Sequence, residues 1–316
     1  MRLLVVDGNA ILHRAFHAMP EWRNRSGEAT SGVYGFFSML IKIKQDLKPD
    51  YLAVAFDAPE PNFRHGLYVG YQSNRGRDEQ LEKDIWEQVD KLKQVLEKLG
   101  VPVYQTGGYE ADDIVGTLCE KALNGKEKTE VVVLTGDRDL LQLVNERVSV
   151  YMPSKGISEG KLLDRNGVRQ KLGVWPEQVV DYKALMGDGS DGYPGVAGIG
   201  PKTAVGLLEK YSDLEGVYKA VVGGGVAGKG MSEGVRMKLA QGQEMAMMSR
   251  KLAEIVRDVP VAFEMEKAKM PSESQLGEAF EGLGYKSLVA RVAGFRKGKE
   301  EKKKKDKANE QQTSLF

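Results

Sequence analysis

Three short apolar runs, each ending in an aspartate, constrain the fold of this chain more than any other feature. They are RLLVVD at residues 2–7, YLAVAFD at 51–57 and EVVVLTGD at 130–137. The runs lack polar alternation, which is typical of strands in a parallel sheet that helices cover on both faces. Helical patterns lie between them over residues 31–47, 79–100 and 110–123. We therefore predict an α/β fold with a central, mostly parallel sheet flanked by helices.

Beyond about residue 175 the pattern becomes helical with glycine-rich turns, which predicts a second region. The predicted division is an α/β core over residues 1–175, a helical region over 176–295 and a disordered basic tail over 296–316. Within that tail, residues 296–307 hold eight Lys or Arg against three acids and lack apolar periodicity. A lysine run is most often only a solvated tail.

Composition excludes several classes of protein. The chain is 41% hydrophobic and 29% charged, as in ordinary globular proteins. It has no apolar run near the roughly 20 residues that span a bilayer, and its N-terminal run is too short for a signal peptide. Cys119 is the single cysteine, so there is no disulfide framework. We expect a cytoplasmic, monomeric protein with no membrane partner.

Nine acidic residues follow the predicted strands or lie in glycine-rich turns, away from the polar faces of helices. The carboxyl ends of parallel strands meet at one edge of a sheet, where ligands bind. A single aspartate there would be explained as a helix cap, and dispersed acids as a solvated face. The segment GGYEADD at 107–113 opens a helix, whose N-terminus favours negative charge. The nine residues are Asp7, Asp57, Glu110, Asp112, Asp113, Asp137, Asp139, Asp188 and Asp191.

This carboxylate set predicts a metal site. The chain has only three histidines, so an imidazole-rich site is not expected. Carboxylate oxygens suit Mg²⁺ or Mn²⁺. Nine acids exceed what one ion needs, and we therefore predict two ions. Such a pair activates water and stabilises the leaving oxygen of a phosphodiester.

Residues 195–208, GVAGIGPKTAVGLL, have the form of a helix–hairpin–helix. Gly198 and Gly200 permit a tight turn, and Pro201 starts the next helix. The N-terminal amides of that helix and Lys202 would hold a DNA phosphate. A turn of this kind is commonly a mere connection, but it directly follows the Asp188/Asp191 pair.

Residues 59–77 interleave arginines, which can contact phosphates, with aromatic residues, which can stack on unpaired bases. The arginines are Arg64, Arg75 and Arg77, and the aromatics are Phe63, Tyr68 and Tyr71. The alternative is a surface loop whose aromatics belong partly to the core. Tyr34 would be either a stacking platform or part of the helix packing.

Five motifs occur in the order found in the 5′-nuclease superfamily. They are VVDGNAILHRAFHA, FDAPEPNFRH, GYEADDIVGTL, LTGDRDLLQLV and GDGSDGYPGVAGIGPKTA. Over about residues 1–295 the chain resembles the 5′→3′ exonuclease domain of bacterial DNA polymerase I, a relative of the flap endonucleases. The resemblance implies a nucleoid-associated enzyme of replication and repair. It would use two Mg²⁺ ions, replaceable by Mn²⁺, to hydrolyse DNA or RNA strands near a 5′ end at flaps, nicks and junctions.

The resemblance also implies residue roles. The first ion would be held by Asp7, Asp57, Glu110 and Asp112. The second would be held by Asp137, Asp139 and Asp191, with Asp113 and Asp188 contributing directly or through water. A helical arch over about residues 60–100 would admit the 5′ strand. The catalytic set would be Asp7, Asp57, Arg64, Arg75, Glu110, Asp112 and Asp137. The DNA contacts would be Tyr34, Arg64, Tyr71, Gln72, Arg75, Arg77, Gly198, Gly200, Lys202 and Thr203, with a K⁺ ion at the hairpin.

Two positions depart from the family pattern. Gln72 stands where a lysine usually contacts the scissile phosphate, and losing that cation would slow turnover. Gly192 stands where asparagine is common, and we expect little effect. The alternative to a nuclease is therefore a catalytically weakened DNA-junction binding protein, and an enzyme acting mainly on RNA primers is also open.

The last residues, QTSLF, resemble the peptide that bacterial replication proteins insert into the β sliding clamp. Its expected contacts are Gln312, Leu315 and Phe316. Because no polymerase sequence follows, we expect a stand-alone nuclease.

Overall fold

The computed structural model describes residues 1–20, 22–23, 27–73, 79–125, 128–154, 159–223 and 230–294. Within them a six-stranded sheet has the order β3-β2-β1-β4-β5-β6. Neighbouring strands are parallel except for the antiparallel pair β5 and β6. The strands are β1 (Arg2–Asp7), β2 (Tyr51–Ala55), β3 (Val103–Tyr104), β4 (Glu130–Leu134), β5 (Val148–Pro153) and β6 (Gly160–Leu163).

The three predicted strands form the middle of this sheet. In β1, Val5 pairs with Ala53 of β2 on one side and with Val133 of β4 on the other. All three side chains are fully buried, which explains why the runs carry no polar alternation. The predicted α/β fold with a central, mostly parallel sheet is confirmed.

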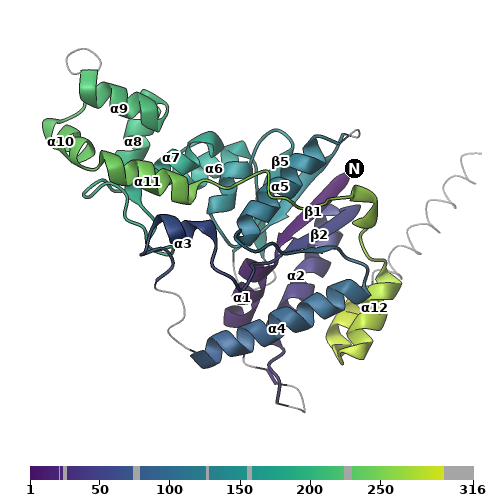
Figure 1. Ribbon diagram of the computed structural model, residues 1–316. Helices are drawn as coiled ribbons and strands as arrows, with labels where there is room; N and C mark the ends of the chain where they lie inside the picture. Colours follow the sequence, from purple (N-terminus) through teal and green to yellow (C-terminus); the bar gives the residue numbers. More distant parts are fainter. Residues whose placement is uncertain are drawn as a thin grey trace, which may run out of the picture.

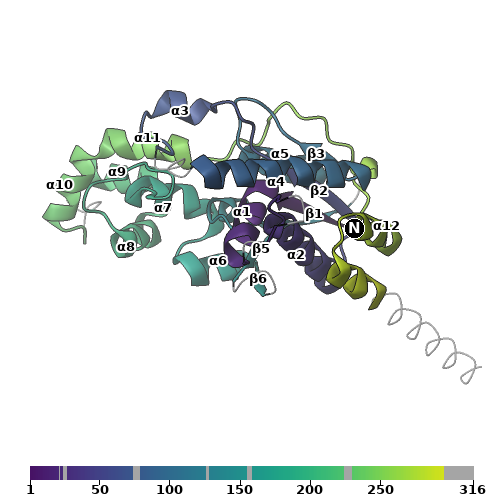
Figure 2. The ribbon, with the colours of Figure 1, turned by 90° about the horizontal axis from the view of Figure 1, so that it is seen from below.

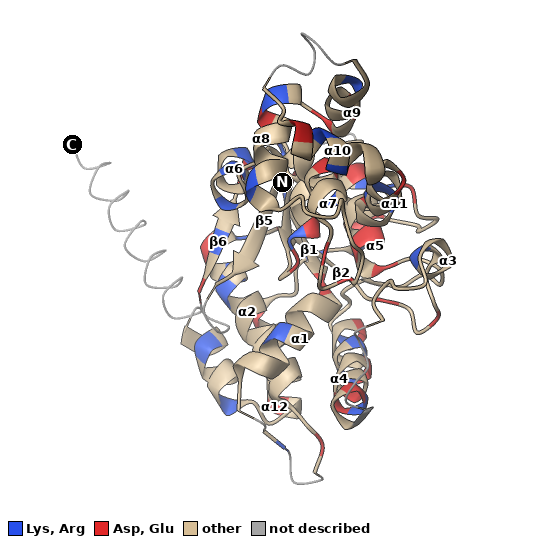
Figure 3. Ribbon diagram, turned by 90° about the vertical axis from the view of Figure 1, so that its left-hand side faces the viewer, with Lys and Arg blue, Asp and Glu red and all other residues tan. Residues whose placement is uncertain are grey.

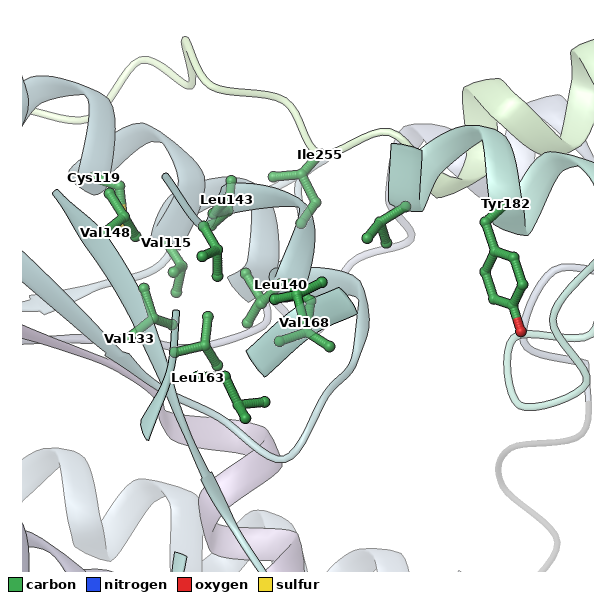
Figure 4. Packing of buried hydrophobic residues seen from close by; sticks show 14 of the residues in the cluster. Val115, Cys119, Val133, Leu140, Leu143, Val148, Leu163, Val168, Tyr182 and Ile255 are labelled. Atoms are coloured by element: carbon green, nitrogen blue, oxygen red, sulfur yellow. The ribbon is translucent and has the colours of Figure 1, made fainter. Parts of the chain in front are cut away.

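Helices cover both faces of the sheet (Figures 1 and 2). Leu4 and Val6 of β1 face one layer, and Leu3 and Val5 face the other. The first layer consists of α1 (Gly8–Ala18), α2 (Ser31–Leu47), α4 (Glu79–Lys98) and α12 (Glu273–Gly282). The second begins with α5 (Ala111–Leu123), η1 (Asp139–Leu143) and α6 (Arg165–Leu172). Figure 4 shows the second layer, with Val115, Val133 and Leu140 packed together.

The predicted helices agree closely with these elements. The helix expected over residues 31–47 is α2, and the apolar stripe of the helix expected over residues 79–100 lies in and just after α4. That stripe is buried along its whole length, and its members are Ile85, Val89, Leu92, Leu96 and Leu99.

A helical region extends from one end of the sheet (Figure 1). It contains η2 (Pro176–Gln178), α7 (Val179–Met186), α8 (Pro201–Tyr211), α9 (Leu214–Gly223), α10 (Glu233–Gln241) and α11 (Gln243–Ala253). Helix α7 packs against both α8 and α11. The short helix α3 (Phe63–Leu67) also contacts α11.

After α11 the chain returns to the α/β core through η3 (Met265–Lys267). The Leu52 amide donates to the Ala268 carbonyl, and the Met270 amide donates to the Asp50 carbonyl. In α12, the Phe280 ring lies 5.2 Å from the Phe37 ring of α2, measured between centroids. Part of the segment predicted as helical region, 176–295, therefore packs on the core, and the predicted domain limits stay a prediction. None of the described helices is long and apolar enough to cross a membrane.

Candidate active site

A cleft of about 790 Å³ opens at the carboxyl edge of the sheet. Seven of the nine predicted acids line it, and they come from strand ends, the start of α5 and the turn after α7. Figure 3 shows acidic segments at β1 and α5 in this part of the ribbon. The seven are Asp7, Asp57, Glu110, Asp112, Asp137, Asp139 and Asp191. The expected convergence of strand ends is therefore present in the structure.

Five of these acids form what we call the first carboxylate group: Asp7, Asp57, Glu110, Asp112 and Asp137. Backbone amides and a hydroxyl orient two of them, Asp7 and Asp57. The Asp7 carboxylate caps α1 by accepting a hydrogen bond from the Ala10 amide. It also accepts one from the Thr135 hydroxyl at 2.8 Å. Asp57 accepts from the Ala111 amide at 2.7 Å. Because Ala111 is the first residue of α5, that helix end and the β2 end hold each other in place.

Burial, with repulsion between neighbouring acids, raises the pKa of three members of the first carboxylate group, Asp7, Glu110 and Asp112. Burial raises the pKa of Asp7 to about 7, and repulsion from Asp57 and Asp137 adds to the rise. Burial also raises the pKa of Asp112 well above its usual range, with Asp137 and Asp7 adding to the effect. The pKa of Glu110 rises to about 7, chiefly through burial and against the attraction of Arg64. Among the described residues, no lysine or arginine forms an ion pair with Asp7 or Asp112.

The second carboxylate group consists of Asp139, Asp188 and Asp191, with one oxygen from each lying within 4.8 Å of the others. Asp188 and Asp191 belong to a turn closed by mutual backbone hydrogen bonds between Asp188 and Tyr193. This grouping differs from the predicted one in two ways. Asp188 is a full member, whereas Asp137 is the neighbouring charge that most raises the pKa of Asp112 in the first group.

A lysine that the sequence analysis did not single out lies inside the second carboxylate group. The ammonium of Lys183, on α7, contacts the carboxylates of both Asp139 and Asp188. Although burial alone would raise it, the pKa of Asp188 lies below its usual range because Lys183 and Ser190 donate to the carboxylate. The second group therefore contains its own cation.

Two predicted site residues, Arg64 and Asp113, form a buried pair next to Glu110 of the first carboxylate group. The Arg64 guanidinium is 2% exposed and donates to both oxygens of Asp113, at 2.7 and 2.8 Å. It also donates to the carbonyls of Leu252 and Glu254, while Asp113 accepts from the Val256 amide.

This placement does not support the predicted phosphate contact of Arg64, nor the predicted metal contact of Asp113. A buried guanidinium with its donors engaged is not available to a nucleic acid, and Asp113 is fully buried beneath it. We correct the role of both residues: the pair joins α3, α5 and the segment after α11. Arg64 also forms an ion pair with Glu110, with Nη1 3.1 Å from Oε2, and so helps to hold this cleft residue in place.

Two of the aromatic residues predicted to stack on bases, Tyr71 and Tyr34, make contacts within the protein. Tyr71 is buried, its hydroxyl donates to Glu110 at 3.0 Å, and its ring stacks on that of Tyr193. The Tyr34 ring packs edge-on against Trp22 and Tyr285. Neither placement supports base stacking. Both rings instead pack within the protein, which is the alternative considered for Tyr34.

Gln72 reaches the first carboxylate group directly. Its side-chain amide donates to Glu110 Oε1 at 2.7 Å, and its backbone amide donates to the Asp191 carbonyl. The neutral amide thus occupies a position beside Glu110 where the family pattern has a cation. The neighbouring Gly192 has φ of +75°, and a Cβ there would lie 2.7 Å from the Gly70 carbonyl oxygen.

The predicted hairpin has the expected backbone. Helix α7 precedes it, Gly198 has φ of +77°, Gly200 is the N-cap of α8, and Pro201 is its first residue. Lys202 is exposed and Thr203 is half-buried. The Gly198 carbonyl accepts from the Lys238 ammonium at 3.2 Å.

Several predicted residues lie outside the described part of the chain. They are Arg75, Arg77, Gln312, Leu315 and Phe316. Within the predicted arch over about residues 60–100, the structure describes residues 60–73, which include α3, and residues 79–100, which include α4.

The cleft also contains residues that the sequence analysis passed over. Asn9, His13 and His17 line it from α1, and Asn62 donates to Glu110 at 2.8 Å. The i,i+4 spacing of His13 and His17 on a helix that begins at Asp7 was a usable signal, because such residues share a helix face. Lys183 offered no comparable local signal.

Two family models match consecutive parts of the sequence. Residues 2–173 match the 5′-3′ exonuclease, N-terminal resolvase-like domain. Residues 174–275 match the 5′-3′ exonuclease, C-terminal SAM fold. DNA polymerase I of Bacillus caldotenax is 39% identical over 293 residues, which are 92% of this chain and 32% of that protein. The Bacillus subtilis enzyme is 36% identical over the same shares. The chain thus spans about a third of the length of these curated relatives.

Two solved structures from bacteriophage T5 share the fold. A protein crystallised with metal ions has a TM-score of 0.65 at 18% identity, covering 94% of this chain and 99% of its own. A flap endonuclease in a pseudo-enzyme-product complex with DNA and metal ions has a TM-score of 0.65 at 17% identity, covering 94% and 98%. Divalent-metal and DNA complexes thus occur on this fold. Since the two family models together cover residues 2–275, the chain belongs to the 5′-3′ exonuclease family.

Proposed function

We propose that the protein is a metal-dependent, structure-specific 5′→3′ exonuclease and flap endonuclease that hydrolyses phosphodiesters near the 5′ ends of branched or nicked DNA and of RNA primers. The observation that carries this proposal is the convergence of seven carboxylates on one cleft. Their raised pKa values at Asp7, Glu110 and Asp112 mean that the cleft favours positive charge.

The donor set fits two Mg²⁺ ions, with Mn²⁺ as a substitute. Both groups offer carboxylate oxygens, which these hard cations prefer. The first ion would be held by Asp7, Asp57, Glu110 and Asp112, with Asp137 between the two positions. The second would be held by Asp139, Asp188 and Asp191. Bound there, the pair would activate a water molecule and stabilise the leaving oxygen.

The chain's own residues hold this site in shape. Thr135 and the Ala10 amide orient Asp7, and the Ala111 amide orients Asp57. Asn62, Tyr71 and Gln72 donate to Glu110. Such fixed donors keep the carboxylates aimed into the cleft despite their mutual repulsion, and this preorganisation supports catalysis.

We place the duplex at the helix–hairpin–helix. The free amides at the start of α8, with Gly198, Gly200, Lys202 and Thr203, would grip a phosphate, and hairpin carbonyls would bind K⁺. The arch over about residues 60–100, with Arg75 and Arg77, would admit the 5′ strand.

We place the protein in the bacterial cytoplasm at the nucleoid, as a monomer. Its other proposed partner is the β sliding clamp, through Gln312, Leu315 and Phe316, which lie outside the described residues. Deleting residues 312–316 should abolish clamp binding in a pull-down, and undiminished binding would contradict this assignment.

The function is tested with a 5′-labelled flap substrate, incubated with Mg²⁺ or with EDTA. We expect cleavage near the junction only with Mg²⁺, loss of cleavage in Asp137→Ala, and full cleavage in the control Lys267→Met, whose lysine pairs with Glu264 at the surface. Tight binding without cleavage under all conditions would overturn the nuclease and support the alternative, a junction-binding protein. Comparing the cleavage rates of a DNA flap and an RNA flap of the same sequence shows which nucleic acid the enzyme prefers.

A further inference from the structure

We propose that the Lys183 ammonium is the resident counter-ion of the second carboxylate group, and that the second divalent ion binds by displacing it. This inference rests on the proposed two-ion function. Lys183 would then lower the affinity of the protein for the second ion without changing its affinity for the first.

The position of Lys183 carries the inference. Its side chain is 9% exposed, and its ammonium contacts Asp139 and Asp188, two of the three carboxylates whose oxygens lie within 4.8 Å of one another. An ammonium surrounded in this way occupies the space that a divalent ion bound to the same oxygens requires. Helix α7, which carries Lys183, is packed between α8 and α11, so the backbone of Lys183 is fixed and only its side chain can move away.

Charge balance gives the lysine a consequence for metal binding. Three ionised carboxylates carry three negative charges, and the ammonium reduces the net charge of the group to minus two. A divalent ion entering the second group must break two buried ion pairs, which takes free energy away from binding. In the first group, Asp7 and Asp112 have no such pair among the described residues. The first ion therefore meets no competing cation at these two carboxylates.

The chemistry of lysine suits exchange better than permanent structure. Its ammonium is a compact point charge on a flexible four-carbon stem, without the bidentate lock of a guanidinium. The Arg64–Asp113 pair in the same protein shows the locked arrangement, with two parallel hydrogen bonds to one carboxylate. We therefore assign structural locking to Arg64 and exchangeable charge compensation to Lys183.

The test is Mn²⁺ binding to the full chain, counted by electron paramagnetic resonance and titrated by calorimetry. In Lys183→Met the second-ion Kd should fall about tenfold, as coupling between contacting charges allows, while the first-ion Kd stays unchanged. Lys183→Arg, which keeps the charge, should bind the second ion no more tightly than wild type. Lys91→Met, which removes an exposed ion-paired lysine, should match wild type at both sites.

A second-ion Kd that is unchanged or higher in folded Lys183→Met overturns the inference and leaves the two-ion function standing. Absence of any second ion in wild type overturns both. If the variant does not fold, acetylation of wild-type lysines by acetic anhydride, read by mass spectrometry, decides the question. Lys183 should react several-fold faster in excess Mg²⁺ than in EDTA, and an equal rate overturns the inference.

Discussion

Both carboxylate groups contribute to one cleft, but their charge is balanced in different ways. The first is built from strand ends and the start of α5, and burial with mutual repulsion raises the pKa of Asp7, Glu110 and Asp112. The second is built from η1 and the turn after α7, and Lys183 helps to lower the pKa of Asp188. Repulsion at Asp7 and Asp112 is therefore left for a metal ion to relieve, whereas Lys183 already neutralises part of the second group.

The largest expected effect is that of removing one carboxylate from each group. Asp112→Asn should lower single-turnover flap cleavage on the order of 10³-fold, because it removes a ligand and a fixed charge from the reacting centre. In EDTA the same variant should have a higher Tm than wild type, since a repelled carboxyl is replaced by a neutral amide. Asp188→Asn should instead lower the Tm in EDTA, because Lys183 loses one partner. If both variants shifted the Tm in EDTA in the same direction, the proposed difference in charge balance between the two groups would be wrong.

The next largest effect is expected from breaking the buried ion pair between Arg64 and Asp113. Arg64→Gln should lower the free energy of unfolding by about 3–5 kcal/mol, because Asp113 is left as a buried, unpaired charge. Arg64→Lys should recover little, since an ammonium cannot reproduce the bidentate contact. Urea denaturation measures both. The control Arg236→Gln, at an exposed pair with Glu233, should change stability by less than about 1 kcal/mol. An Arg64→Gln loss as small as this control would contradict the assignment.

A smaller effect is expected from pH in the absence of metal. Asp7 and Glu110 bind protons more tightly in the folded chain than at their ordinary pKa values of 3.8 and 4.5. Their contribution to stability is fully present below those values and is lost as the pH rises through about 7. The Tm in EDTA should therefore fall between about pH 5 and pH 8, and excess Mg²⁺ should remove the fall. A Tm in EDTA that stays level or rises over this pH range would show that ionising Asp7 and Glu110 does not destabilise the folded chain.

The smallest effect concerns the neutral donor beside Glu110. Gln72→Lys should raise the single-turnover rate about tenfold, because an ammonium would stabilise negative charge that develops in the transition state. The same cation would counter the repulsion at Glu110, to which Gln72 now donates. An unchanged rate would show that Gln72 does not limit turnover.

The sequence predicted the first group better than the second. Strand-terminal Asp7 and Asp57, and Glu110 and Asp112 at the helix start, follow from local patterns whose geometry is fixed by a parallel sheet. Lys183 lies 44 positions from Asp139, and only the packing of α7 against η1 brings the two together.

The placement of Arg64 could not be predicted, for a similar reason. An arginine among aromatics suggests a nucleic-acid surface, but Arg64 turns inward to Asp113 and to the carbonyls of Leu252 and Glu254. Nothing in the local pattern reveals that the segment after α11 crosses there. Long-range packing, not propensity, decides whether a charged residue faces solvent.

The most direct test of the central claim is proton release on metal binding. Mg²⁺ is titrated into the metal-free protein in buffers of different ionisation enthalpy, at about pH 6.5 and at about pH 9. The first ion should displace more protons at pH 6.5 than at pH 9, because Asp7 and Glu110, with pKa values of about 7, bind protons at pH 6.5 and lose them by pH 9. Binding that releases no protons at pH 6.5 would contradict the claim that this crowded group is built to receive a metal.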